Sequence, residues 1–344
     1  QTGRERTAKS MITKGLRQGY WSNFKIFKAI KKFWPQLVLL LVSLLFFYPV
    51  NLQGKIPLPL DALVGAHIPW TEYSWEGYPA GVPIKNQEIT DAISQFYPWK
   101  SLVGEFWRNG KFPLWNFFMF NGTPFLATLH SAALYPLHAL YLLFSDQNAW
   151  TMLLFLQILL AGIFMYLLLR DYKLSNASSY FGAIAFSLSG YMIAWLEFGT
   201  GGQAGLWLPL LLLVEKKFID TGRRLYLFFI PFVFFLIFTA GDFQVPSYIS
   251  ATYFLYGLYR IITTRNKKAL FTEKLFPVFT AFVFAVLLSS IQLIPTIELF
   301  KNSVRANDPY IEQYFYGLMN WEKVTNFIWP DFFGNIVTRN YWSK

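Results

Sequence analysis

Two aspartates, Asp61 and Asp91, are the residues of this sequence best suited to acid–base chemistry. Asp91 is followed closely by the amide side chain of Gln95. In a groove walled partly by apolar groups, a carboxylate can have its pKa raised and can act as a general base on a hydroxyl group. The alternative role for each aspartate is a helix cap or a solvated surface acid, and the sequence alone leaves both roles open.

Further polar residues lie near the ends of long apolar runs. We expect six of them to converge on one cavity, namely Glu197, Gln203, Asp242, Gln244, Gln292 and Glu298. Arg305 follows the last run, and its guanidinium group carries a fork of donors that suits a phosphate. A contact with a lipid headgroup is the alternative role for Arg305.

Metal chemistry receives little support from the composition. The chain has no cysteine, and its three histidines, His67, His130 and His138, are scattered along the sequence. A thiolate metal site is therefore impossible and a histidine zinc site is not expected. One or two aspartates do not decide whether a divalent metal ion takes part, so the cofactor stays unknown.

Membrane-spanning helices are the elements that must position these residues. The chain is 54% hydrophobic, 20% aromatic and only 14% charged, which leaves too little polar surface to cover a soluble globule of this length. Several apolar runs approach the roughly 20 residues that a helix needs to cross a bilayer. The sequence therefore predicts an all-α polytopic membrane protein with seven spans, at residues 34–52, 149–169, 177–197, 203–215, 225–240, 245–262 and 275–295.

The basic residues predict how these spans are oriented. With a cytoplasmic N-terminus, the predicted inner loops hold Arg170, Lys173, Lys216, Lys217, Arg223, Arg224, Arg265, Lys267, Lys268 and Lys274. The short outer loops 198–202 and 241–244 hold no Lys or Arg. Because Lys and Arg are enriched in cytoplasmic loops, the basic segment 1–33 is expected inside, and residues 53–148 and 296–344 outside. The net charge of +11 thus indicates topology rather than nucleic-acid binding.

The outer loop 53–148 is long and rich in aromatic residues. A short surface helix is predicted to begin near Pro98 and to end at Asn109-Gly110. The stretch from Leu126 to Phe144 is nearly long enough to span, but a crossing there would put every later basic cluster on the wrong side. We therefore interpret it as an interfacial or re-entrant segment. A loop of this length usually carries function.

An ordered series of motifs covers most of residues 90–305. Its members are Asp91-Ala-Ile-Ser-Gln95-Phe-Tyr-Pro98, Pro113-Leu-Trp115-Asn116, Asn121-Gly-Thr-Pro124, Ser131-Ala-Ala-Leu-Tyr135-Pro136, Gly241-Asp-Phe-Gln244 and Gln292-Leu-Ile-Pro295-Thr-Ile-Glu298, followed by Ser303 and Arg305. The series resembles the YfhO-like family of bacterial membrane proteins. It departs from the family at Asp242, where members often have His, and at His130, where they often have Gln.

The resemblance implies a GT-C-like helical bundle whose large first outer loop carries membrane-surface helices. It also implies sugar transfer on the outer face of the bacterial plasma membrane, from a polyprenyl-phosphate sugar donor to a cell-envelope polymer or lipid acceptor, as in lipoteichoic acid glycosylation. Asp91 would be the family's loop acid, with Gln95 beside it, and Asp61 is a second candidate. Family members tend to be longer, so the chain is expected to hold a core module and 296–344 to be truncated.

The resulting hypothesis is a lipid-linked glycosyltransferase in contact with membrane lipids. Asp91 or Asp61 would deprotonate the acceptor, and Arg305 with Gln95 would hold the departing phosphate. The remaining binding residues would be Trp99, Trp115, Asn116, His130, Glu197, Asp242, Gln244 and Glu298. Two alternatives remain open: a non-enzymatic transporter or flippase of a lipid-linked precursor, and a scaffold for envelope assembly.

Overall fold

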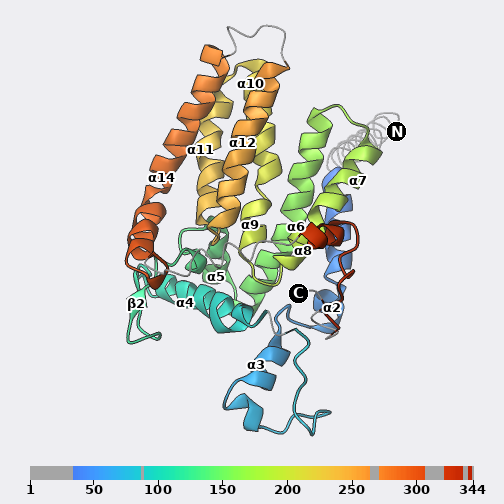
Figure 1. The fold of residues 1–344 in the computed structure, drawn as a ribbon, viewed down its shortest axis with the longest axis vertical. Helices are drawn as coiled ribbons and strands as arrows, with labels where there is room; N and C mark the ends of the chain where they lie inside the picture. Colours follow the sequence, from blue (N-terminus) through green and yellow to red (C-terminus); the bar gives the residue numbers. More distant parts are fainter. Residues whose placement is uncertain (1–33, 87–88, 264–270, 307–320, 336–339, 343–344) are drawn as a thin grey trace, which may run out of the picture. The chain divides into compact units, whose positions relative to one another are not determined.

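The computed structural model describes residues 34–86, 89–263, 271–306, 321–335 and 340–342, so the predicted basic segment 1–33 lies outside the described residues. The chain divides into two compact units, residues 1–53 and 54–344. Regular structure in the described residues is helical apart from two short strands (Figure 1). This agrees with the predicted all-α class.

The first unit contains one apolar helix, Trp34–Phe46, followed by α2, Tyr48–Gln53. The sequence predicts one continuous span over 34–52, but the helix breaks at Phe47. Asn51 in α2 donates from Nδ2 to the Leu44 carbonyl at 3.0 Å across this break. The predicted span is therefore two shorter helical pieces.

A helical bundle forms the body of the second unit. Its long helices are α6 Asp146–Asp171, α7 Asn176–Ser187, α10 Leu208–Thr221, α11 Arg224–Thr239, α12 Gln244–Ile262 and α14 Phe276–Lys301 (Figure 1). The pairs α11–α14, α6–α7, α10–α11 and α6–α10 pack against each other. Local sequence sets several of the boundaries. The Ser175 side chain accepts from the Ser178 amide at 3.1 Å and so caps α7, while Gly222, at φ +69°, ends α10 in the left-handed conformation that glycine favours.

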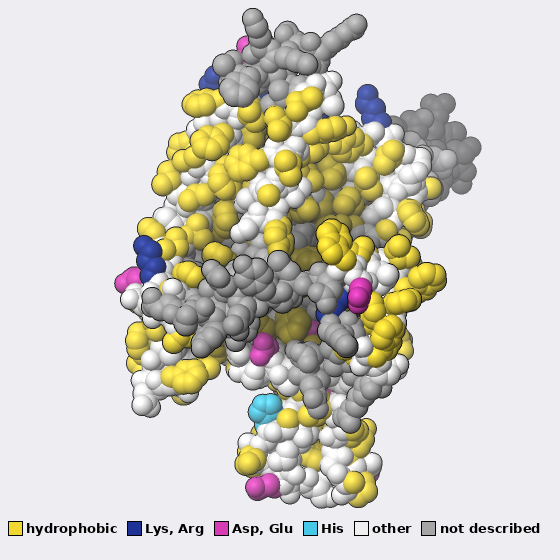
Figure 2. Space-filling view, viewed as in Figure 1, with side chains coloured by type: hydrophobic (Ala, Val, Ile, Leu, Met, Phe, Trp, Pro, Cys, Tyr) yellow, Lys and Arg dark blue, Asp and Glu magenta, His cyan; other side chains and the backbone are white. Residues whose placement is uncertain are grey.

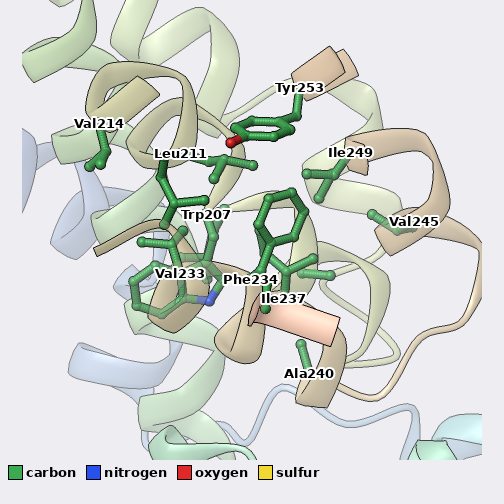
Figure 3. Close-up of a cluster of buried hydrophobic side chains, with 14 of the residues drawn as sticks. Trp207, Leu211, Val214, Val233, Phe234, Ile237, Ala240, Val245, Ile249 and Tyr253 are labelled. Carbon is green, nitrogen blue, oxygen red and sulfur yellow. The ribbon is translucent and has the colours of Figure 1, made fainter. Parts of the chain in front are cut away.

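The core of this bundle lies between α10, α11 and α12 (Figure 3). Phe234 is fully buried, and its ring meets the rings of Tyr253 and Phe282 edge to face, each with centroids 5.1 Å apart. Burying one such side chain contributes roughly 2–3 kcal/mol. Tyr253 also donates its buried hydroxyl to the Val278 carbonyl at 2.9 Å, which ties α12 to α14.

Two further predicted spans are broken in the structure. Residues 177–197 form α7 and then a short helix α8, Gly190–Ala194, while residues 203–215 fall on α9, Gly201–Gly205, and on α10. Ser189 caps α8 through the Met192 amide, and Pro209 lies in the first turn of α10, so each new helix has its own start signal. By length and composition, one described helix, α6, can cross a membrane alone, and the bent pair Glu273–Leu288 and Ser290–Lys301 is a second if it counts as one span.

The stretch from Leu126 to Phe144 is not one helix. It contains two short 3₁₀ helices, η4 Leu129–Ser131 and η5 Pro136–Ala139, and then α5, Leu140–Leu143. The stretch contains no continuous helix, which agrees with the expectation that it does not span the membrane. It is hydrogen-bonded to the bundle at two points. Near its start the Leu126 carbonyl accepts from Gln292 Nε2 on α14 at 2.8 Å, and farther on the Tyr135 hydroxyl donates to Gln203 Oε1 on α9 at 3.3 Å.

The rest of the predicted outer loop is built from short elements. They are α3 Leu60–Ala66, η1 Trp70–Glu72, the π-helical turn η3 Ala92–Phe96, α4 Tyr97–Arg108, and the antiparallel strands β1 Trp115–Asn116 and β2 Thr123–Pro124. A further 3₁₀ helix, η8 Trp321–Phe327, lies near the C-terminus. Helix α4 confirms the limits of the predicted short helix, with Pro98 in its first turn and Asn109 as its C-cap.

Candidate functional site

The site begins at a π-helical turn that runs directly into α4. The turn η3 follows Asp91, and its widened backbone continues into the α-helical geometry of α4 at Tyr97. Such turns are rare and frequently occur at functional sites. Asp91 is exposed, and Gln95 Nε2 donates to its Oδ1 at 3.3 Å. The structure thus brings these two predicted site residues together.

A pocket of about 360 Å³ lies beside α4, a turn farther along the same helix. One face of the η3–α4 helix lines it, together with the β1–β2 hairpin and the start of α6. Its polar and aromatic lining residues are Ser94, Trp99, Ser101, Glu105, Asn116 and Asp146. Asp91 does not line the pocket, but it precedes the lining residue Ser94 by three residues in the sequence.

The pocket combines two acids with an aromatic wall. Trp99 donates its indole N–H to the Met119 sulfur at 3.1 Å and packs edge to face on Phe125, with centroids 6.4 Å apart. Asp146 accepts from Arg108 Nη1 at 3.1 Å, whereas Glu105 is exposed. Carboxylates accept hydrogen bonds from hydroxyl groups and a ring offers an apolar face, so this lining suits a polyhydroxylated molecule such as a sugar.

The hairpin supplies the opposite wall. Asn116 is buried and its Oδ1 accepts from the Phe118 amide at 2.9 Å, which shapes the turn. Trp115 lies outside the pocket, with its indole against Gly122, where a Cβ would come within 2.4 Å of Nε1. At the tip, Phe117, Phe118 and Phe120 are 69%, 79% and 87% exposed. Of the predicted aromatic binding residues, only Trp99 therefore reaches the pocket.

A second polar cluster lies on the buried side of α4. Lys100 is fully buried, and its Nζ has no hydrogen-bond partner among the described residues but lies 5.4 Å from the Phe96 ring centroid and 5.8 Å from that of Trp150. Burial lowers the pKa of Lys100 to about 7. Burial and the nearby Lys100 charge also hold the pKa of His138 well below its usual range. Both groups therefore favour the neutral form.

The other predicted site residues lie apart from the pocket. His130 Nδ1 is 2.8 Å from the Gly241 carbonyl oxygen, and the next residue, Asp242, accepts the Val245 amide at 2.7 Å at the start of α12. Gln244 contacts the Tyr248 hydroxyl one turn along the same helix. These three residues form a neighbouring group near the start of α12, but none of them lines the pocket.

None of the six polar residues that were expected to converge on one cavity lines the pocket beside α4. Gln203 is buried and hydrogen-bonded to Gln157, and Gln292 is buried against the Leu126 carbonyl, so both join segments of the fold. Glu197 and Glu298 are exposed and do not line the pocket. Polar side chains at helix ends can form hydrogen bonds with many nearby groups. Similar positions at the ends of helices therefore do not imply that these side chains line the same cavity.

Asp61 and Arg305 complete the predicted set. Asp61 Oδ2 accepts the Lys85 backbone amide at 2.8 Å, which joins α3 to the following loop, and Asp61 is not among the pocket residues. The Arg305 backbone lies in η7, Val304–Ala306, and its side chain lies outside the described part of the structure. Within the described residues, no three His, Asp or Glu side chains lie close enough together to hold a metal ion.

Sequence reasoning did not assign Glu105, Asp146 or Lys100 to a site. A partial indication existed for Glu105, because Ser94, Ser101 and Glu105 recur at helical spacing on one face. Asp146 reaches the pocket only because α6 begins beside α4, which is a tertiary contact. Lys100 lies in an amphipathic helix, where a lysine is ordinarily solvent-exposed.

Comparison with known proteins gives one match. The family described as "Bacterial membrane protein YfhO" matches residues 85–335, a range that includes the η3–α4 helix, the hairpin, the pocket and the bundle. No curated protein and no solved structure matches the chain. Since the matched residues make up most of the sequence and contain the whole candidate site, the chain belongs to the YfhO family of bacterial membrane proteins.

Proposed function

We propose that this protein is a membrane glycosyltransferase of the GT-C type. It would move a sugar from a polyprenyl-phosphate donor to a cell-envelope acceptor on the outer face of the plasma membrane. The observation that carries the proposal is the pocket beside α4, in which Trp99, Glu105 and Asp146 surround a space of about 360 Å³. The hydrogen-bonded Asp91–Gln95 pair belongs to the same η3–α4 helix and lies next to the first lining residue, Ser94, in the sequence.

The proposed reaction is a displacement at the anomeric carbon. The acceptor oxygen attacks this carbon, the bond from the carbon to the phosphate oxygen breaks, and polyprenyl phosphate leaves with the bonding electrons. Asp91 takes the hydroxyl proton of the acceptor, because it is an exposed carboxylate next to the pocket-lining stretch in the sequence and Gln95 holds it in place.

Substrate binding is assigned to the pocket and to two residues at its margin. Trp99 would pack on the sugar ring, and Glu105 and Asp146 would accept bonds from its hydroxyls. Gln95 and Arg305 would hold the departing phosphate, whose developing charge requires a donor or a cation. The assignment of Arg305 rests on its sequence position and residue type alone.

Sugar transfer by the purified, reconstituted protein tests this proposal. A panel of polyprenyl-phosphate sugars would be offered to the wild type and to Asp91→Asn, with Glu76→Gln as a control in an exposed acid that does not line the pocket. We expect Asp91→Asn to lower kcat at least about 100-fold, as loss of a general base typically does, and Glu76→Gln to retain activity.

The variant Asp61→Asn distinguishes between the two candidate general bases, Asp61 and Asp91. If its activity falls while Asp91→Asn stays active, the base is Asp61 and the assignment of Asp91 is wrong. If the wild type binds the donor but transfers no sugar, the proposed enzymatic activity is wrong, and a transporter or flippase of a lipid-linked precursor is favoured. Unchanged envelope assembly in cells carrying both variants, together with no donor binding, would favour a scaffold.

A further inference from the structure

An apolar groove runs along the side of the bundle between α11 and α14. It has a volume of about 630 Å³ and is lined mainly by aromatic and aliphatic side chains, among them Phe228, Phe232, Phe276, Phe284 and Leu288. Phe228, Phe276 and Phe284 are each at least 60% exposed. Figure 2 shows that hydrophobic side chains cover most of the visible side of these helices. A groove of this composition on a membrane protein is suited to a hydrocarbon chain.

One end of the groove carries a charge. Arg224, the first residue of α11, lines the groove there, and among the described residues it forms no ion pair with a carboxylate. The polar lining residue Thr280 donates its hydroxyl to the Phe276 carbonyl at 2.9 Å and is thus satisfied within its own helix. The guanidinium of Arg224 is left as the group that can bind a ligand's polar end.

The length of the groove fits one membrane leaflet. From Phe276 to Leu288 along α14 is about 18 Å at the helical rise of 1.5 Å per residue. Half of a bilayer core is about 15 Å thick. Just beyond Leu288, helix α14 bends by 68°, so the straight wall of the groove ends at that depth.

From this arrangement we propose that the α11–α14 groove binds one anionic phospholipid, with an acyl chain along the groove and its phosphate on Arg224. Arg presents paired N–H donors that match two phosphate oxygens. Arg223 is the neighbour of Arg224 in the sequence. Lys274 Nζ reaches the Phe218 carbonyl at the end of α10, the helix that precedes Arg224. This local positive charge favours an anionic over a zwitterionic headgroup. The inference is independent of the sugar-transfer proposal.

The adjacent arginines provide a matched experiment. Arg223 and Arg224 are both exposed and carry the same charge, but only Arg224 lines the groove. The full chain would be extracted in mild detergent, exchanged into nanodiscs with equal phosphatidylglycerol and phosphatidylcholine, and stripped stepwise before the retained lipid is quantified by mass spectrometry. We expect about one phosphatidylglycerol per wild-type chain, at least a fivefold loss in Arg224→Gln, and less than a twofold change in Arg223→Gln.

A second variant blocks the groove without touching a charge. Thr280→Trp should lower phosphatidylglycerol retention by a similar factor, whereas Ile291→Trp, at an exposed position outside the groove, should not. Equal losses in Arg224→Gln and Arg223→Gln would overturn the proposal in favour of nonspecific attraction. Equal retention of phosphatidylcholine and phosphatidylglycerol would also overturn the proposal. Displacement of the phospholipid by an equimolar polyprenyl phosphate would overturn it as well, because the groove would then bind the glycosyl donor.

Discussion

At the scale of single residues, the buried side chain of Lys100 is a costly feature of α4. A charged amine without a hydrogen-bond partner is expensive to bury, and burial between the rings of Phe96 and Trp150 lowers the pKa of Lys100 to about 7. In an unfolded chain the same amine titrates near its ordinary pKa of 10.5. The difference between these two states couples folding to pH.

Replacing Lys100 with methionine should stabilise the protein. Between pH 7 and 10.5 the unfolded state binds a proton that the folded state does not, so the stability of the wild type should rise as pH increases through this window. Lys100→Met should raise the free energy of unfolding near pH 7 by about 2–4 kcal/mol and flatten this dependence. Thermal unfolding in detergent from pH 6.5 to 10 measures both effects, with the exposed Lys111→Met as control. A destabilised Lys100→Met with an unchanged pH profile would show that the buried amine has a partner.

The residue scale also shows what sequence can and cannot reveal about the site. Asp91 and Gln95 were predicted as neighbours from a motif, and four residues of helical spacing are enough to bring them together. Asp146 and Asn116 reach the same pocket from elements far apart in the chain, so their approach to Trp99 depends on packing that no local pattern encodes. Trp115 was predicted to bind substrate; its indole ring lies against Gly122 on the hairpin, outside the pocket lining.

At the scale of elements, the β1–β2 hairpin controls one wall of the pocket. Its turn places Phe120, Asn121 and Gly122 at positive φ, with Gly122 at +114°. A side chain at Gly122 would be strained in that conformation and would also collide with the Trp115 indole. The shape of the pocket therefore depends on one glycine that contacts no substrate.

Gly122→Ala should open this wall. We expect it to lower the free energy of unfolding by about 1–3 kcal/mol and to weaken donor binding more than it lowers kcat, because Asn116 and Met119 would shift while Asp91 stays in place. Titration of the variant with a polyprenyl-phosphate sugar gives the binding change. Gly110→Ala is a useful comparison, since Gly110 also has positive φ, at +65°, but its Cβ would meet no atom within 4 Å. Equal effects of the two variants on binding would rule out the contact with Trp115 as the cause.

Element boundaries were predictable where local chemistry sets them. The limits of α4, α6 and α11 follow apolar runs, a proline in the first turn, or a terminal Asn-Gly pair, and the structure agrees within a few residues. The breaks within 34–52, 177–197 and 203–215 were missed. Hydropathy averages over a window and does not detect a serine that caps a new helix, as Ser189 does for α8.

At the scale of the whole molecule, the broken helices bear on how the predicted spans are counted. In lipid, an interrupted helix is tolerated only where protein covers the freed backbone groups. Every residue of α9 is buried, and so are Leu206 and Trp207 at its junction with α10. Residues 201–221 together would extend about 31 Å as a helix, close to the roughly 30 Å of a bilayer core. The α9–α10 pair is therefore compatible with a single crossing, and seven crossings remain the prediction.

The absence of cysteine from the sequence makes this topology directly testable. If each broken pair crosses once, single cysteines at Ser74 and Phe243 should react with a membrane-impermeant maleimide in intact cells, whereas those at Leu174 and Thr221 should react only after lysis. All four positions are exposed, so burial does not account for a difference in labelling. Labelling of Thr221→Cys from outside together with Phe243→Cys would mean that α11 does not cross. The reverse pattern at all four positions would invert the orientation and place the pocket beside α4 on the cytoplasmic face, where the proposed acceptor polymer is absent.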